Sequence, residues 1–76
     1  MKTENMQISI KTEYIKLDQL LKYSGIAENG SDAKDMILDE IVKFNGEICT
    51  MRGKKVRSGD IVEVDFEDET VIISVE

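Results

Sequence analysis

The apolar residues of this chain follow first the period of a strand and then the period of a helix. Every second residue from Met6 to Ile10 is apolar, as in a strand that buries one face. From residue 17 onward, leucines recur three and four positions apart. Gly25 then stands where a helix C-cap commonly turns left-handed. The pattern predicts a strand over residues 6–10 and a helix over residues 17–24.

A second helical pattern follows after a short break. Asn29 and Ser31 are both good N-cap residues, and Asp32 and Asp35 fall in the first turn, where the helix dipole favours negative charge. We therefore expect a helix over residues 31–40. Its apolar stripe is formed by Ala33, Met36, Ile37 and Ile41.

The rest of the chain has the features of strands joined by turns. Asn45-Gly46 separates two apolar/polar segments over residues 42–48, which is a strong hairpin signal. Residues 61–66 and 70–75 are further strand candidates, bounded by turns at residues 58–60 and 67–69. The predicted fold class is α+β, with two short helices packed on a small twisted antiparallel sheet. The expected core comprises Leu17, Leu20, Leu21, Ile26, Ala33, Ile37, Val42, Phe44, Ile61, Val64 and Phe66.

Length and composition narrow the possible functions. Seventy-six residues predict a single small domain over 1–76, globular because 41% of the residues are hydrophobic. The chain has no histidine, and Cys49 is its only cysteine, so a zinc site, a disulfide and most acid–base catalysis are not expected. No apolar run suits a signal peptide or a membrane span. We expect a cytoplasmic, non-catalytic protein without metal or cofactor.

The charge distribution is uneven. The chain has 16 acidic and 10 basic residues, a net charge of −6, yet four bases (Arg52, Lys54, Lys55 and Arg57) fall within six consecutive residues. Residues 60–76 hold seven acids and no base. Like charges placed together repel each other, so the basic run indicates a negatively charged partner that approaches from one side.

The order of these features resembles a known RNA-binding family. A basic residue, Leu and Asp open the first helix (Lys16-Leu17-Asp18), and Asn29-Gly30 precedes Ala33. Val42-Lys43-Phe44-Asn45-Gly46 follows as a hairpin, and Gly59-Asp60 precedes the next strand. Together these pieces, over about residues 16–65, resemble the alpha-L RNA-binding motif of the ribosomal protein S-four-like domain.

Within that family the chain is most similar to the small stand-alone bacterial proteins of the YaaA and YbcJ kind. Ala33-Lys34 and Arg52-Gly53-Lys54-Lys55 match their pattern. Glu40 stands where the larger family usually has Gly, and the Arg that the family usually has in its second helix is absent. We therefore expect the basic run, rather than the second helix, to make the main RNA contact. The resemblance implies structured RNA, and for the stand-alone group ribosomal RNA and ribosome assembly.

The chemistry of the residues agrees with an RNA partner. Lysine and arginine neutralise phosphates and release counterions, and the arginine fork grips phosphate oxygens in pairs. Structured RNA is recognised largely by shape and backbone, whereas an aromatic content of 5% argues against a platform that stacks a single strand. The predicted RNA-binding residues are Lys16, Asn29, Gly30, Ser31, Lys34, Arg52, Gly53, Lys54, Lys55 and Arg57.

Two other functions remain open at this point. The first is a protein-interaction adaptor that presents an acidic sheet edge (Glu63, Asp65 and Glu67) to a basic partner. The second is an enzyme or a sulfur-carrier β-grasp protein, although such carriers end in Gly-Gly and this sequence ends Ser74-Val75-Glu76. We expect a monomer that binds structured RNA, with no membrane partner and no small-molecule substrate.

Overall fold

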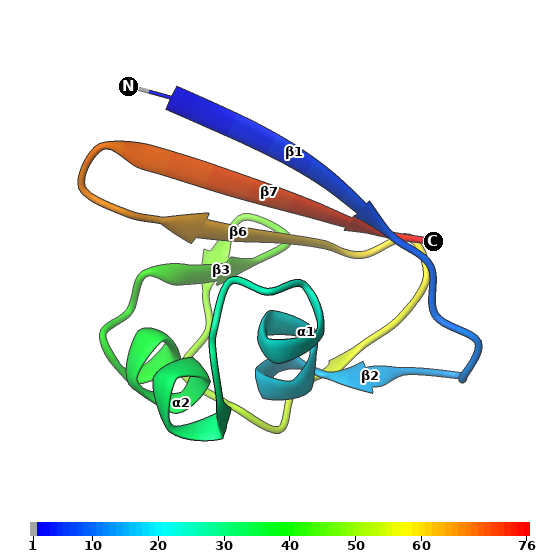
Figure 1. Ribbon diagram of the computed structural model, residues 1–76. Helices are drawn as coiled ribbons and strands as arrows, with labels where there is room; N and C mark the ends of the chain where they lie inside the picture. The colour runs from blue at the N-terminus through cyan, green and yellow to red at the C-terminus, as the bar shows by residue number, and fades with distance from the viewer. Residues whose placement is uncertain (1) are drawn as a thin grey trace.

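The computed structural model describes residues 2–76, which form two helices beneath a five-stranded sheet (Figure 1). The sheet has the strand order β1-β7-β6-β3-β4, and a separate two-stranded sheet pairs β2 with β5. The elements are β1 (Lys2–Ile8), β2 (Ile15–Lys16), α1 (Leu17–Tyr23), α2 (Gly30–Leu38), β3 (Val42–Phe44), β4 (Glu47–Ile48), β5 (Lys55–Val56), β6 (Ile61–Asp65) and β7 (Glu69–Val75).

The sheet is antiparallel except at one edge. β3 and β4 form the antiparallel hairpin that Asn45-Gly46 predicts, and β6 pairs antiparallel with both β3 and β7. β1, however, runs parallel to β7, from Lys2 opposite Glu69 to Ile8 opposite Val75. A parallel pair needs a long connection, and here both helices and five strands separate the partners in sequence. The sheet is therefore mixed, which a local pattern of residues does not reveal.

Both helices lie on one face of the five-stranded sheet and close the core against it (Figure 1). The fully buried side chains come from α1 (Leu17, Leu20 and Leu21), from α2 (Ala33 and Ile37) and from the strands (Val42, Val56, Val62, Val64 and Ile73). In α2 the stripe repeats every three to four residues, so its polar residues face water. No helix within residues 2–76 is long and apolar enough to cross a membrane.

Several predicted boundaries differ from the observed ones. The first strand spans Lys2–Ile8 rather than residues 6–10, because its polar half is held by backbone pairing with β7 and buries no apolar face. Helix α2 begins at Gly30, since Asn29 is the N-cap and its side chain accepts a hydrogen bond from the Asp32 N–H at 2.9 Å. The prediction of Ser31 as the first residue of this helix was therefore one residue late.

The expected core is largely confirmed, with one clear error. Ile61 is 47% exposed, whereas its neighbour Val62 is fully buried. The alternating pattern over residues 61–66 predicts a strand, but Ile61 and Val62 are both apolar, so the pattern does not decide which of them faces the core. Ile26, Phe44 and Phe66 are half-buried against the core rather than inside it. The core also contains residues that the sequence did not single out, namely Ile8, Ala27, Val56, Val71, Ile73 and Val75.

Candidate nucleic-acid interface

The basic segment, residues 52–57, is anchored to the start of α1 through its backbone. The N–H of Leu17 donates to the carbonyl of Lys54 at 2.9 Å, and the N–H of Asp18 donates to the carbonyl of Arg52 at 3.1 Å. These N–H groups would otherwise lack partners at a helix N-terminus. The segment thus replaces a side-chain cap, which Lys16 does not provide. The carbonyls of Arg52 and Lys54 face the helix, and the exposed side chains of Arg52, Lys55 and Arg57 remain available to a ligand.

A second set of hydrogen bonds fixes the other end of the basic segment. The Asp60 carboxylate accepts from the Arg57 N–H at 2.8 Å and from the Asn45 side-chain amide at 3.2 Å. The side-chain oxygen of Asn45 accepts in turn from the Ile61 N–H at 2.8 Å. Asn45 and Gly46 both have positive φ, 50° and 91°, as a tight hairpin turn requires. The turns at Asn45-Gly46 and Gly59-Asp60 are therefore in contact, and together they fix the C-terminal end of the basic segment.

The two central lysines of the segment point to different aromatic rings. The Lys54 ammonium lies 4.9 Å from the centre of the Phe44 ring, and the Lys55 ammonium lies 4.9 Å from the centre of the Tyr14 ring. Consecutive residues of an extended chain point to opposite faces, which explains the divergence. The aromatic faces attract the cations and hold them near the surface. The basic run is thus split between two faces of the segment.

Lys16 lies next to Lys55, on the face of the basic segment to which Lys55 points. β2 and β5 pair antiparallel, with Lys16 directly opposite Lys55 and Ile15 opposite Val56. Both lysines are exposed. Like charges directly opposite each other destabilise a strand pair. The arrangement costs the free protein stability, and an anion bound between the two lysines would offset that cost.

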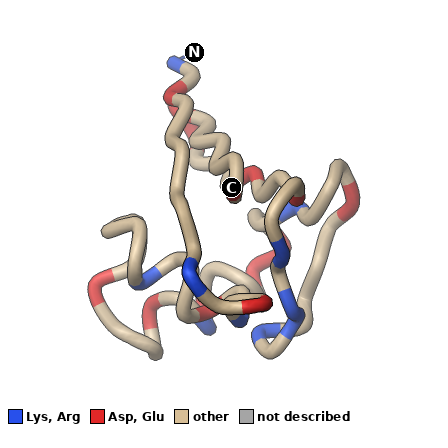
Figure 2. Tube along the Cα trace, turned by 90° about the vertical axis from the view of Figure 1, so that its right-hand side faces the viewer, with Lys and Arg blue, Asp and Glu red and all other residues tan. Residues whose placement is uncertain are grey.

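The charges of the basic segment are not neutralised internally. In the part of the chain that the structure describes, both ion pairs belong to Lys43, which contacts Glu63 at 3.6 Å and Asp65 at 3.3 Å. Arg52 and Arg57 are exposed. Figure 2 marks the basic positions in blue along the trace. The segment therefore presents free cations to solvent.

Gly53 is open on all sides. A Cβ built on this glycine would meet no atom within 4 Å, and its φ is not positive. Neither packing nor backbone conformation therefore requires a glycine at this position. A glycine without a side chain does let a ligand approach the backbone closely.

The start of α2 lies on the same side of the five-stranded sheet as the basic segment (Figure 1). Gly30, Ser31 and Lys34 are exposed, and Lys34 is the fifth residue of the helix, at the start of its second turn. Asn29 already uses its side-chain oxygen as the cap. The contact of these four residues with RNA stays a prediction, as does a continuous positive surface from Lys34 to Lys54.

The acidic residues proposed as an adaptor edge lie elsewhere than expected. Glu63 and Asp65 belong to β6, which is the central strand of the sheet and not an edge. Lys43 contacts both carboxylates, and its pKa is raised by a hydrogen bond and charge attraction from Asp65, with further attraction from Glu63. Partial burial works to raise the pKa of Asp65, but hydrogen bonds with Glu63, Lys43 and Thr70 outweigh it and hold that pKa below its usual value. Lys43 thus neutralises part of the negative charge that the adaptor hypothesis requires.

A groove beside the basic segment was not foreseen from the sequence. Phe44, Lys54 and residues 47–51 line it, and its volume is about 270 Å³. Ile48 and Met51 are 54% and 65% exposed there. Two large apolar residues next to a basic run indicate a possible binding surface, but only the fold shows that both line the same groove. Among residues 2–76, no group of His, Cys, Asp or Glu side chains is placed to hold a metal ion.

Comparison with known proteins identifies the family of this chain. The family model of the S4 domain matches residues 8–74, which extends the expected motif through most of β7 and includes only the last residue of β1. The chain belongs to the S4-domain family. It is also 40% identical over 58 residues to a protein of Bacillus subtilis (strain 168) named "Probable ribosome maturation protein RlbA". That match covers 76% of this chain and 82% of the relative. Membership in the S4-domain family supports the predicted class of a small RNA-binding domain.

Proposed function

We propose that this S4-domain protein binds structured ribosomal RNA through the basic segment and Lys16, and serves ribosome maturation. The observation that carries the proposal is a set of unpaired cations, held by the α1 N-terminus and Asp60 on a chain of net charge −6. A fixed loop retains little freedom to lose when it binds, which favours affinity. The resemblance of the chain to a ribosome maturation protein supports the ribosomal target.

The proposed role is binding without catalysis. The protein would act as a cytoplasmic monomer, without cofactor or small-molecule substrate, and Asn29, Gly30, Ser31 and Lys34 would flank the main contact. Phosphate contacts position an RNA without reading its sequence, so the shape of the RNA would select the site. Acidic residues elsewhere on the surface disfavour binding in other orientations.

The test is the double variant Lys54→Glu/Lys55→Glu, measured by filter binding to deproteinised ribosomal RNA over a salt series. The wild-type log–log slope should be roughly −3 to −5, as expected for 4–6 phosphate contacts, and the variant should lose binding while remaining folded. Because Lys55→Glu also removes the repulsion from Lys16, the melting temperature of the variant should not fall. The control Lys2→Glu/Lys11→Glu makes the same charge change at exposed positions outside the segment. Equal loss in both variants, or none in the first, would contradict the proposal.

A further inference from the structure

We propose that the groove beside the basic segment binds one unpaired guanine base of the RNA whose phosphates the segment holds. The inference rests on the proposed function and adds to it a site that reads base identity. The lining of the groove combines the apolar side chains of Ile48 and Met51, here called its floor, with the cation of Lys54 and the carboxylate of Glu47. Its volume of about 270 Å³ is below the ~300–1,000 Å³ of sites for drug-sized molecules, which suits a fragment such as a single base.

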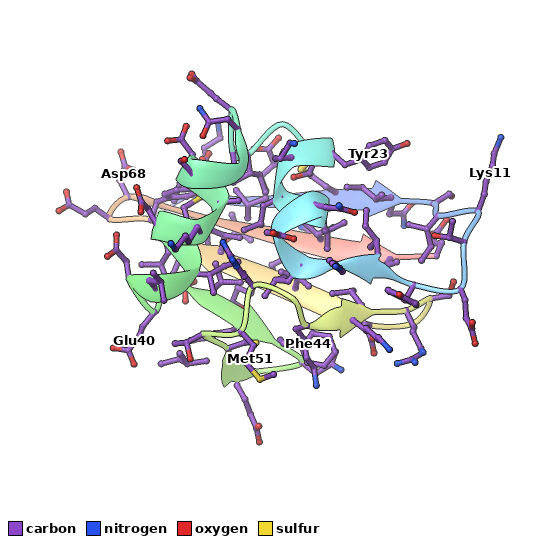
Figure 3. The ribbon with its side chains drawn as sticks, turned by 90° about the horizontal axis from the view of Figure 1, so that it is seen from below. Lys11, Tyr23, Glu40, Phe44, Met51 and Asp68 are labelled. Carbon is purple, nitrogen blue, oxygen red and sulfur yellow. The ribbon has the colours of Figure 1, made fainter. Side chains whose placement is uncertain are left out.

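The floor of the groove carries exposed apolar surface that the fold does not use. Ile48 and Met51 are more than half exposed and line the same groove. Figure 3 shows Met51 and Phe44 at the same edge of the molecule. The unbranched methionine thioether adapts to flat ring systems and makes favourable contacts with them. A planar base laid against this floor would remove the exposed apolar surface from water.

The cation of Lys54 indicates which polymer supplies the base. Lys54 lines the groove and also belongs to the basic segment, so a ligand in the groove adjoins any phosphate on the segment. In the free protein the Lys54 ammonium lies over the Phe44 ring, 4.9 Å from its centre. When Lys54 turns to a phosphate, the face of Phe44 becomes available to a base. Phosphate binding and base binding would therefore favour each other.

Glu47, the carboxylate in the lining of the groove, decides between the bases. A carboxylate repels phosphate and can only accept hydrogen bonds, two of them side by side. Unpaired bases of RNA are read along their Watson–Crick edges. The guanine edge presents two adjacent donors, N1–H and N2–H, whereas the adenine edge places an acceptor beside its one amino donor. The carboxylate thus matches guanine.

The experiment uses a pool of hairpin RNAs with a randomised four-nucleotide loop, selected on the full chain at low salt. We expect enrichment of loops with an unpaired guanosine. Replacing that guanosine by an abasic site in the selected hairpin should weaken binding about 5- to 100-fold, the range for loss of one stacked base. Ile48→Ser/Met51→Ser should bind the guanosine and abasic hairpins equally, with an unchanged salt slope. Glu47→Gln should bind guanosine and adenosine hairpins equally.

The control Leu38→Ser/Ile61→Ser removes two exposed apolar side chains from outside the groove and should keep the preference for guanosine. If the wild type binds the pool with a strong salt slope but without base preference, or if the groove variant retains that preference, this inference fails and the proposed function stands. The same result is expected if the groove serves an apolar side chain of a partner protein. If the wild type binds no RNA at low salt, the proposed function fails as well.

Discussion

At the scale of single residues, Asn45 connects the hairpin to the exit of the basic segment. It combines a left-handed backbone with hydrogen bonds to the Asp60 side chain and the Ile61 backbone. An alanine would lose both the hydrogen bonds and the tolerance of positive φ. A glycine would lose only the hydrogen bonds, so the two variants separate the contributions.

We expect Asn45→Ala to lower the free energy of unfolding by about 2–3 kcal/mol, from roughly 1 kcal/mol per hydrogen bond plus left-handed strain. Asn45→Gly should cost about 1 kcal/mol less than the alanine variant, because glycine adopts positive φ without penalty. Urea denaturation of the three proteins measures both differences. Equal losses would mean that the turn is not strained by alanine.

The lowered pKa of Asp65 predicts how the stability of the protein depends on pH. Its pKa is held below the usual value of 3.8, so the folded state binds this proton less readily than the unfolded state. The resulting stabilisation is present above pH 3.8 and disappears as the pH falls through the folded pKa. The raised pKa of Lys43 acts at the other end, and its contribution is lost as the pH rises above 10.5.

Asp65→Asn should therefore be less stable than the wild type at pH 7, and the difference should shrink once the pH drops below 3.8. Urea midpoints at a series of pH values give the comparison. Asp68→Asn serves as the control, because it removes the same charge at an exposed turn residue. A difference that persists unchanged at the lowest pH would show that the ion pair is not its source.

At the scale of elements, the β2–β5 pair carries two lysines of the proposed RNA surface at a cost in stability. Lys16 and Lys55 face each other across two strands of only two residues each. Replacing Lys16 by Glu converts a repulsive pair into an attractive one. The same change removes a cation from the proposed RNA surface.

Lys16→Glu should raise the free energy of unfolding by up to about 1 kcal/mol and weaken binding to ribosomal RNA. Thermal melting and filter binding on the same sample report the two effects. Lys11→Glu makes the same charge change without a lysine opposite and should leave the melting temperature nearly unchanged. Loss of both stability and affinity in Lys16→Glu would instead indicate that Lys16 packs against the core.

The elements also show what the sequence could predict. Helix α1, the Asn45-Gly46 hairpin and the turn at residues 58–60 are specified by local residues, and all three are observed. β2 and β5 exist only through pairing between distant segments, and neither has a local pattern long enough to detect. The same reason hid the groove, since its walls come from a strand, a hairpin and the loop after it. The sequence shows the run of lysines and arginines, but not that Lys54 and Lys55 point to different faces.

At the scale of the whole molecule, the acidic surface acts over distance. The longest dimension is 32 Å, and Figure 3 shows Asp68 at one end of the molecule, away from Phe44 and Met51. Screening lengths are about 30 Å at 0.01 M salt and about 8 Å at 0.15 M. The field of this turn therefore reaches the RNA surface only in dilute salt.

Asp68→Lys should strengthen RNA binding at 0.01 M salt and leave it nearly unchanged at 0.15 M, as expected for a long-range field. Binding isotherms at the two salt concentrations decide the matter. An equal gain at both would mean that the new lysine touches the RNA directly.

The hydrogen bonds from α1 to the basic segment also couple binding to helix formation. A helix of seven residues is too short to persist by itself, and two of its first N–H groups are satisfied only while the segment is docked. Any opening of the segment exposes the amides of Leu17 and Asp18 to solvent deuterium. RNA that holds the segment closed should slow the exchange of these two amides, although neither one faces the ligand. Helix α1 would then report occupancy of a surface formed by another part of the chain.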